Sequence, residues 1–264
     1  MHMINSMNFP MNKKILTFAI TICNEVEELR LLLSQLVMHY DKNTCDILIL
    51  LDYEHATDKS QMEISRMLNV DFHSAFYARS LRITAAKFLG DFSEFKNKIE
   101  PACNSEYIFQ IDADEVPSIY LIQNLVKILL ANPDADILCV PRINTVHNIE
   151  KKHVIEWGWN ISSIPQFERR PISEASPQAI EFLNELNYIQ NDFYIVPIIN
   201  FPDYQTRIFK TGNDIKWHNK VHEILGKSGN YNIQILPSDD MDYCLLHAKH
   251  IEKQILQNNL YKKL

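Results

Sequence analysis

Short apolar runs alternate with helical patterns along the first part of the chain. Apolar, β-favouring runs at residues 15–23, 46–51 and 70–77 predict three strands, and the first two are typical of strands covered on both faces of a sheet. Apolar side chains at helical spacing predict helices at residues 24–40 and 60–68, between these runs. This alternation predicts the opening of a doubly wound α/β sheet.

A further apolar run ends in a cluster of acidic residues. The segment EYIFQIDADEVP predicts a short buried strand that ends at Asp112, Asp114 and Glu115. Neighbouring carboxylates repel one another and are costly to bury, whereas Mg²⁺ or Mn²⁺ prefers oxygen ligands and removes that cost. Ligands of open α/β sheets bind outside the carboxyl ends of the strands, so the pattern predicts a metal-bound phosphate here. The alternative is a polar turn in which Ser118 opens the next helix.

The second half of the chain has a less regular pattern. Prolines and aromatic residues are frequent over residues 141–200, which include the sequence Trp157-Gly158-Trp159. The elements expected in this half are helices at residues 118–131, 176–186 and 248–264, and strands at residues 137–140, 204–209, 215–217 and 231–236. We therefore expect a smaller subregion beside the main sheet.

Composition and charge narrow the functional classes. The chain has 264 residues, of which 46% are hydrophobic, enough for one large α/β domain. Its net charge of −7, without a basic block, argues against a broad cationic face for nucleic acid. Five cysteines without a CxxC pair favour a reduced compartment, so we expect a cytoplasmic protein without structural zinc. No apolar run approaches the roughly 18 residues of a membrane span, and we expect no transmembrane segment.

Several separated segments resemble motifs of the family 2 glycosyltransferases, in the order in which that family carries them. The segments are TFAITICNEVEELRLLLSQL, DILILLDYEHATD, FSEFKNKI, FQIDADEVPS and PDYQTRIFKTGNDIKWHNKVHEIL. FQIDADEVPS looks like the Asp-x-Asp motif of the family, and the last segment is similar to the block of its soluble branch that ends in Val-His-Glu. The resemblance extends over about residues 13–260.

The resemblance implies a fold, a donor and a cofactor. It implies a single GT-A domain over residues 1–264, with a mixed sheet flanked by helices, a nucleotide-sugar-binding half at 13–116 and an acceptor half at 117–264. It also implies a nucleotide-sugar donor, Mn²⁺ or Mg²⁺, and transfer with inversion at the sugar carbon. The sequence departs from the family at Asp52-Tyr53-Glu54-His55, and at Lys96, which replaces the usual arginine and loses its two-pronged geometry.

The candidate site residues fall into three groups. For the nucleotide sugar we expect Thr21, Asn24, Glu25, Asp52, Lys96, Asn97, Asp112 and Arg207. For the metal, the candidate ligands are Asp112, Asp114, His222 and His247, since carboxylate and neutral imidazole both suit Mn²⁺. Inversion needs a base that takes the proton of the acceptor hydroxyl, and we expect Glu223, with Asp203 as the second choice. Asn24 also fits a capping box with Glu27, and a lone histidine is often structural.

The acceptor is expected to be a hydroxyl group of a bacterial surface glycan or of a modified base in phage DNA. UDP is the commonest donor nucleotide in the family. Abundant Ile, Asn and Lys indicate an AT-rich gene, as in many phages or low-GC bacteria, and a phage enzyme would act in the host cytoplasm. The basic clusters available for a DNA backbone are Arg79, Arg82 and Lys87, and Lys151 and Lys152. Trp157, Trp159 and Trp217 are candidates for an apolar sugar platform.

Two alternative functions come from other classes. A nucleotidyltransferase acting on a sugar phosphate would normally carry a glycine-rich phosphate loop after its first strand, and Ile22-Cys23-Asn24-Glu25 contains no glycine. A nucleotide-sugar-binding protein without turnover would not need the acidic residues Asp112, Asp114 and Glu223, which are all present.

Overall fold

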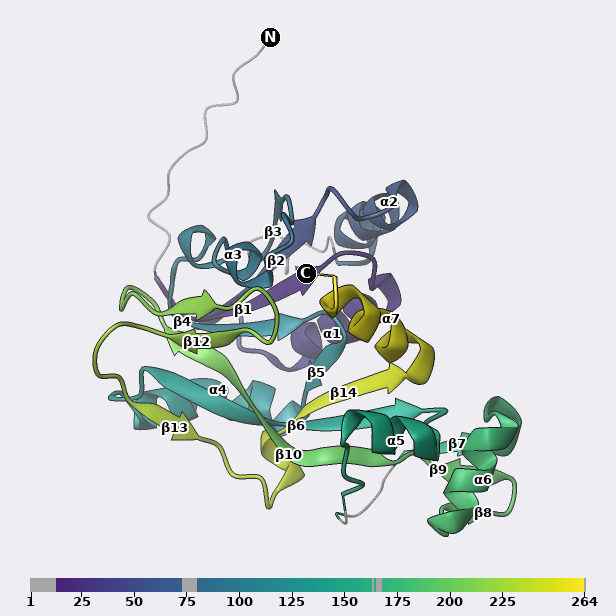
Figure 1. The fold of residues 1–264 in the computed structure, drawn as a ribbon. Coiled ribbons are helices and arrows are strands. Elements are labelled where there is room, and N and C mark those ends of the chain that lie inside the picture. Colours follow the sequence, from purple (N-terminus) through teal and green to yellow (C-terminus); the bar gives the residue numbers. More distant parts are fainter. Residues whose placement is uncertain (1–12, 73–79, 163, 165–167, 264) are drawn as a thin grey trace.

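A mixed sheet of nine strands forms the centre of the molecule (Figure 1). The computed structural model describes residues 13–72, 80–162, 164 and 168–263. In spatial order the strands are β3 (Leu81–Ala86), β2 (Cys45–Asp52), β1 (Lys14–Ile22), β4 (Ser105–Asp112), β10 (Ile198–Lys210), β6 (Ile137–His147), β14 (Leu245–His250) and β5 (Glu115–Pro117), while β13 (Ile233–Ile235) pairs with β6. The first four are parallel, and β10 runs antiparallel between β4 and β6. The sheet therefore joins the two halves of the chain.

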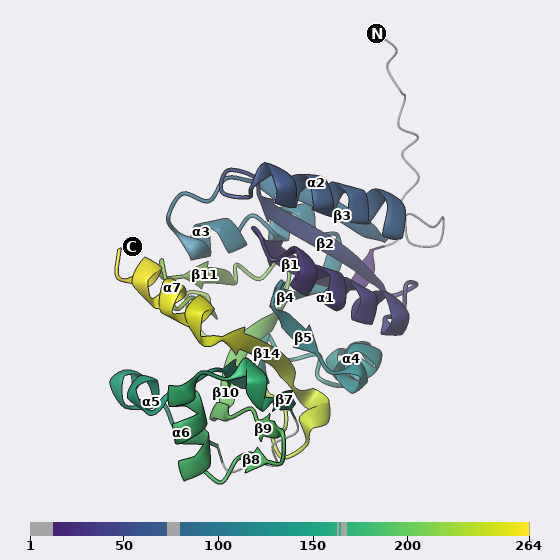
Figure 2. The same cartoon turned by 90° about the vertical axis from the view of Figure 1, so that its right-hand side faces the viewer.

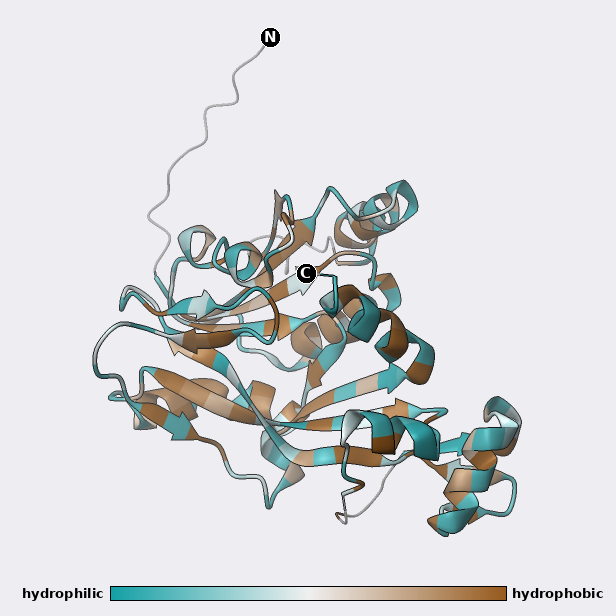
Figure 3. Cartoon of the chain, in the orientation of Figure 1, coloured by the Kyte–Doolittle hydropathy of each residue, from teal (hydrophilic) through white to brown (hydrophobic). Residues whose placement is uncertain are grey.

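The two faces of the sheet bury alternate side chains of the same strand. On β1, Phe18 and Ile20 belong to an apolar cluster with α1 (Val26–His39), α2 (Asp58–Arg66) and α4 (Ile119–Ala131). Ala19 belongs to a second cluster with α3 (Phe92–Lys96) and with the hairpin of β11 (Lys216–His218) and β12 (Ile224–Gly226). Figure 3 shows the apolar colour concentrated on the central strands. The continuous apolar runs of the sequence arise because both faces are covered.

A smaller subregion adjoins one edge of the sheet. It contains α5 (Lys151–Trp157), α6 (Pro177–Glu185) and a three-stranded sheet of β7 (Arg169–Pro171), β9 (Phe193–Ile195) and β8 (Ile189–Gln190). In both views this subregion lies far from β2, β3 and α2 (Figures 1 and 2). The C-terminal helix α7 (Ile251–Tyr261) returns from β14 toward α3, where the Phe92 and Tyr261 rings are 6.0 Å apart. The C-terminal helix therefore crosses the region between the main sheet and the smaller subregion.

Most of the regular elements predicted from periodicity are confirmed. The strands at residues 15–23, 46–51 and 106–112 correspond to β1, β2 and β4. The helix after Ser118 is α4, and Ser118 Oγ accepts a hydrogen bond from the Leu121 N–H. The doubly wound α/β class and the smaller subregion are also observed.

Three local predictions were wrong. A π-helical turn, Met67–Asp71, occupies the start of the strand expected at residues 70–77. Residues 73–77 of that expectation lie outside the described residues, and the third strand is β3. The start of the helix expected at residues 248–264 belongs to β14, whose alternation is masked by polar residues. Asn24 does not form the expected capping box, because its side chain binds the loop at residues 55–57.

None of the helices in the described residues has the length and apolar character that a membrane crossing requires.

Candidate active site

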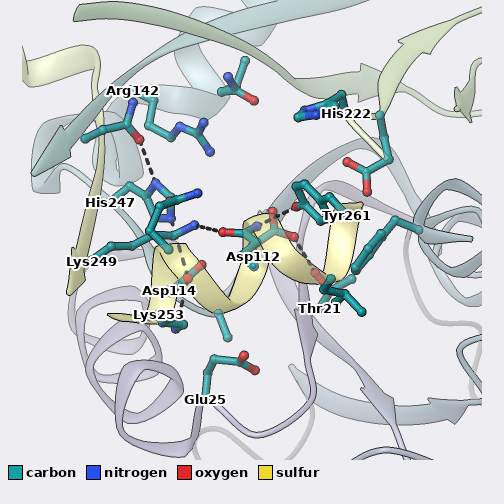
Figure 4. Close-up of a pocket in the computed structure, with 18 of the residues that line it drawn as sticks. Thr21, Glu25, Asp112, Asp114, Arg142, His222, His247, Lys249, Lys253 and Tyr261 are labelled. Carbon is teal, nitrogen blue, oxygen red and sulfur yellow. Dashed lines mark hydrogen bonds and ion pairs between the residues drawn. The ribbon is translucent and has the colours of Figure 1, made fainter. Parts of the chain in front are cut away.

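A large cavity opens at the carboxyl ends of β1, β2 and β4. Its volume is about 1370 Å³, and its lining includes Thr21, Asp52 and Asp112, which lie at or near the ends of these strands. Residues of β6, β10, β14 and α7 also line it, together with residues of α3, α5, β12 and several loops. This is where open α/β sheets bind ligands, and Figure 4 shows side chains from both halves of the chain that meet there.

Asp112 ends β4 and is surrounded by hydrogen-bond donors. Thr21 Oγ1 donates to its Oδ1 at 2.7 Å, and Arg207 Nη2 donates to its Oδ2 at 2.8 Å. Lys96 Nζ lies 3.3 Å from Oδ1, and only 6% of the Lys96 side chain is exposed. Burial alone would raise the pKa of Asp112, but Arg207 and Lys96 hold it well below its usual value. Four residues predicted to bind the nucleotide sugar thus meet at one point.

Glu115 is the buried centre of a longer chain of ion pairs. Its Oε1 accepts hydrogen bonds from Arg142 Nη1 at 2.8 Å and Arg207 Nη2 at 2.6 Å, and its side chain is fully buried. At the two ends of this series of ion pairs, Arg142 Nη2 lies 2.7 Å from Asp203 Oδ2, and Lys96 Nζ lies 3.7 Å from Glu223 Oε2. The order of alternating charges is Asp203, Arg142, Glu115, Arg207, Asp112, Lys96 and Glu223. Each buried charge therefore has an opposite neighbour, which offsets its desolvation.

Asp114 lies beside this series of ion pairs, and its carboxylate faces His247. Asp114 Oδ2 is 3.6 Å from His247 Nε2, while His247 Nδ1 is 2.7 Å from Asn144 Oδ1. An amide oxygen only accepts, so Nδ1 carries the proton and Nε2 offers its lone pair on the side of Asp114. Burial lowers the pKa of His247, which keeps the imidazole neutral.

This pair fits a divalent cation. Histidine ligands of metals usually donate their other ring N–H to an oxygen, as His247 does to Asn144. No third His, Cys, Asp or Glu joins the pair in a metal-type cluster among the described residues, but Mg²⁺ commonly takes one or two protein ligands and completes its shell with water and substrate phosphate. Asp114 and His247 are therefore the residues that would hold the metal.

The other two candidate metal ligands have different surroundings. Asp112 directs its oxygens toward Arg207, Lys96 and Thr21. The His222 ring lines the cavity and meets the Tyr261 ring edge-on, with 5.3 Å between centroids. The structure brings neither of them into the Asp114–His247 pair.

The two candidate bases differ in how their carboxylates are engaged. Asp203 accepts hydrogen bonds from Arg142, Asn144 and Gln205. Burial would raise the pKa of Asp203, but Arg142 and these amides outweigh it and lower the pKa. Glu223 lines the cavity with Lys96 as its ion-pair partner. The residue before it, His222, has a φ of +53°, which is uncommon outside glycine and occurs often at functional sites.

Two residues predicted to bind the nucleotide sugar lie outside the cavity lining. Asn97 exchanges two hydrogen bonds of 2.9 Å with the backbone of Trp217. Asn24 accepts from the Thr57 N–H and donates to the His55 carbonyl. Contrary to the expectation, their amides are used to hold neighbouring loops.

Glu25 and Asp52 do line the cavity, where each also holds a loop. Glu25 Oε2 accepts from the N–H groups of Cys23 and Asn24 at 3.1 and 3.0 Å. Asp52 Oδ1 accepts from the Phe88 N–H at 3.2 Å, and Asp52 Oδ2 lies 2.8 Å from His55 Nδ1. These bonds fix the shape of the cavity rim.

Two lysines near Asp114 were missed by the sequence analysis. Lys253 of α7 places its Nζ 3.2 Å from Asp114 Oδ2 and 3.3 Å from Glu28 Oε1. Lys249 lines the cavity, and its Nζ donates to the neutral amide of Gln257 at 2.6 Å. Within the described part of the chain Lys249 forms no ion pair with a carboxylate, and burial lowers its pKa. Recognition of β14 as a strand would have placed Lys249 on the same face as His247.

Comparisons with known proteins bear on the fold. No protein-family model matches the chain, and no curated protein does. Among solved structures, one that matches is Staphylococcus aureus TarS 1-349 in complex with UDP. The match covers 89% of this chain and 60% of the TarS chain, at 15% sequence identity and a TM-score of 0.50. The chain has a GT-A-like fold. It spans less than two thirds of that TarS chain.

Two further structures resemble this GT-A-like chain more distantly. TarS 1-349 in complex with UDP-GlcNAc matches 86% of the chain and 60% of its own, at 13% identity and a TM-score of 0.44. The mannosyltransferase PcManGT from Pyrobaculum calidifontis, in complex with GDP-Man and Mn²⁺, matches 50% of the chain and 37% of its own, at 18% identity and a TM-score of 0.41.

Replacing Glu115 by alanine leaves two buried guanidinium groups without their shared partner. We expect Glu115→Ala to lower the free energy of unfolding by about 3–5 kcal/mol, since it removes from a buried network the carboxylate shared by Arg142 and Arg207, which then have only Asp203 and Asp112 as ion-pair partners among the described residues. Urea unfolding followed by circular dichroism measures the change. Glu63→Ala is the matched control, because Glu63 lies 3.8 Å from Lys59 at the surface and its loss should cost about 0–1 kcal/mol. Equal costs for the two variants would contradict the central role of Glu115.

Proposed function

We propose that the protein is an inverting, metal-dependent glycosyltransferase that moves a sugar from a nucleotide-diphosphate sugar to a hydroxyl group of a glycan. The observation that carries the proposal is the Asp114–His247 pair in a large cavity at the carboxyl edge of a GT-A-like sheet. The carboxylate and imidazole suit a divalent cation, and the position suits a diphosphate. The complex of TarS with UDP makes UDP the nucleotide to test first.

In this proposal the nucleotide lies against the ends of β1, β2 and β4, and its diphosphate points toward Asp114. Asp114 and His247 would hold the cation, which would supply Lewis-acid charge to stabilise the departing diphosphate. Lys249 places a second positive charge in the cavity, where its amine donates to the neutral amide oxygen of Gln257 and forms no ion pair with a carboxylate among the described residues. An amine in a partly dry cavity without a directly paired carboxylate favours an anionic ligand, so we assign Lys249 to the diphosphate.

Glu223 is the proposed base. Its carboxylate takes the proton of the acceptor hydroxyl while the acceptor oxygen bonds to the sugar C1. The bond from C1 to the diphosphate oxygen breaks on the opposite side, and the electron pair leaves with the diphosphate. Asp203 is less suited, because its carboxylate accepts bonds from Arg142, Asn144 and Gln205.

The pairing of surface cations favours a glycan over phage DNA as acceptor. A DNA backbone needs cations that are free to replace its counter-ions. Every described residue of the expected basic clusters has a carboxylate partner within 2.9 Å: Arg82 with Asp46, Lys87 with Glu54, Lys151 with Glu185, and Lys152 with Glu150. Arg79 lies outside the described residues. We place the enzyme in the cytoplasm, in keeping with its free cysteines.

The structure also bears on the nucleotidyltransferase alternative. In phosphate-binding loops, the backbone N–H groups after the first strand point at the ligand. Here the Glu25 carboxylate accepts from two of those groups, Cys23 N–H and Asn24 N–H. This arrangement disfavours phosphate binding at that turn. A binding protein without turnover is distinguished by whether UDP is released from a UDP-sugar over time.

The deciding experiment is calorimetric titration with UDP, in Mn²⁺ and in chelator. We expect Mn²⁺-dependent binding that Asp114→Ala weakens by about 100-fold, because the variant removes one of the two metal ligands. Asp239→Ala, at an exposed position outside the cavity, is the matched control and should bind as the wild type does. Equal binding in chelator would refute the metal requirement, and no binding of any nucleoside diphosphate would refute the transferase assignment.

Lys249→Gln tests the assignment to the diphosphate. We expect UDP to bind about tenfold more weakly, since one charge-assisted bond is lost, while uridine binds unchanged. Lys249→Arg should retain most of the affinity for UDP. Lys127→Gln, at an exposed position on α4, is the control for loss of charge alone. A parallel loss of uridine binding would mean that Lys249 only supports the fold.

Glu223→Gln tests the base. Turnover should fall by roughly 10²–10⁴-fold, because the proton acceptor is lost, while calorimetry shows UDP binding within twofold of the wild type. Asp203→Asn should instead lower the free energy of unfolding, since the partner of Arg142 is weakened. If Asp203→Asn abolishes turnover in a stable protein and Glu223→Gln does not, the two roles are reversed.

A further inference from the structure

In the sequence Trp157-Gly158-Trp159, the indole rings of the two tryptophans pack against each other. Gly158 ends α5 with a φ of +64°, and a Cβ built there would meet nothing within 4 Å. The glycine is therefore needed for its backbone conformation and not for space. The Trp159 N–H then donates to the Val154 carbonyl at 3.0 Å, and the rings of Trp157 and Trp159 meet edge-on at 4.8 Å.

Both indoles line the cavity that contains Asp114. One side of the pair packs on an apolar cluster that includes Val146 and Ile199, and the surface that remains lines the cavity. Trp217 differs, because it is 4% exposed in the core and does not line the cavity. Of the three tryptophans expected to form a sugar platform, Trp157 and Trp159 therefore remain candidates.

The cavity is larger than one ligand needs. Typical ligand pockets measure about 300–1,000 Å³, whereas this cavity measures about 1370 Å³. The proposed nucleotide site lies at the ends of β1, β2 and β4. Helix α5, which ends at Trp157, lies across β14 from these strands in both views (Figures 1 and 2). The arrangement leaves room for a second ligand on the side of the indoles.

Three neutral polar side chains line the same cavity as the indoles: Thr145, Asn200 and Tyr204. Charged residues are also present, since Glu156 and Lys262 line a smaller hollow beside Trp157. Asn200 accepts from the Asn160 N–H through its Oδ1 at 2.7 Å, and its amide nitrogen forms no hydrogen bond within the described ranges. Its φ of +53° is the left-handed conformation that clusters at ligand sites. Large apolar ring faces with neutral amide and hydroxyl groups suit a carbohydrate ring, which offers both C–H faces and hydroxyl groups.

We infer that Trp157 and Trp159 form the acceptor subsite, and that its ligand is an uncharged pyranose ring. The inference rests on the proposed function, because it identifies the acceptor of that same reaction. The indoles bind the C–H face of the ring, and the Asn200 amide donates to one of its hydroxyl groups. A second hydroxyl group is then directed toward Glu223 and the donor sugar.

The test measures nucleotide and sugar binding separately. Wild-type protein, Trp159→Ala and Trp157→Ala are first titrated with UDP and Mn²⁺, and we expect dissociation constants within twofold of one another. Saturation-transfer NMR in the presence of UDP and diamagnetic Mg²⁺ then probes methyl pyranosides of glucose, galactose, mannose and N-acetylglucosamine. We expect at least one glycoside to bind the wild type, and to bind either variant at least tenfold more weakly. Ile155→Ala is the matched control, because Ile155 is exposed on the same helix and does not line the cavity.

A second measurement avoids dependence on the folding of the variants. In wild-type protein labelled with 5-fluorotryptophan, the glycoside should shift the ¹⁹F signals of Trp157 and Trp159 and leave that of the buried Trp217 unchanged. The acceptor inference is overturned if no glycoside binds the wild type, or if binding is equal in the tryptophan variants. It is also overturned if a duplex with hydroxymethylated bases binds through these residues instead. Failure of UDP to bind the wild type would refute the proposed function separately.

Discussion

The buried Glu115 carboxylate is the interaction on which the rest of the site depends. It lies between two arginines from the neighbouring antiparallel strands β6 and β10. Without it, two largely buried guanidinium groups would face each other without a shared counter-ion, which is costly in a low-dielectric interior. Through Arg207 it fixes Asp112, and through Arg142 it fixes Asp203. Asp112 and Asp114 line the cavity. Glu115, the next acidic residue, instead binds Arg142 and Arg207.

This chain of charges separates the groups that hold the site from those that are available for chemistry. Asp112 and Asp203 use their oxygens on arginine, lysine, threonine and amide donors. The Asp114–His247 pair and the Lys249 amine remain turned toward the cavity without that degree of engagement. A rigid buried network beside less constrained groups is what preorganised catalysis requires, because the surroundings then need little rearrangement during the reaction.

The C-terminal strand and helix complete the site across the sheet. β14 brings His247 and Lys249, and α7 brings Lys253, so three of the basic groups around Asp114 come from the last residues of the chain. The subregion that carries α5 contributes the indole pair to the lining of the same cavity. Donor and acceptor are thus proposed to meet at the junction of two structural parts that are far apart in sequence.

The sequence by itself determined the strand–helix alternation, the buried parallel strands and the acidic cluster at the end of β4, because these features follow from local periodicity. It also supplied Arg207, Glu223 and His247 as candidates. It did not recognise β14, since polar residues on that strand conceal its alternation. Only the tertiary structure decided which candidates meet. The register of β14 places His247 opposite Asn144 on β6 and opposite Glu115 on β5, and this pairing brings its ring to Asp114. His222 also lines the cavity, but its ring packs on Tyr261 and not beside Asp114, and the Asn97 amide binds the Trp217 backbone. Sheet order and register are properties of long-range pairing, and no local pattern in the sequence encodes them.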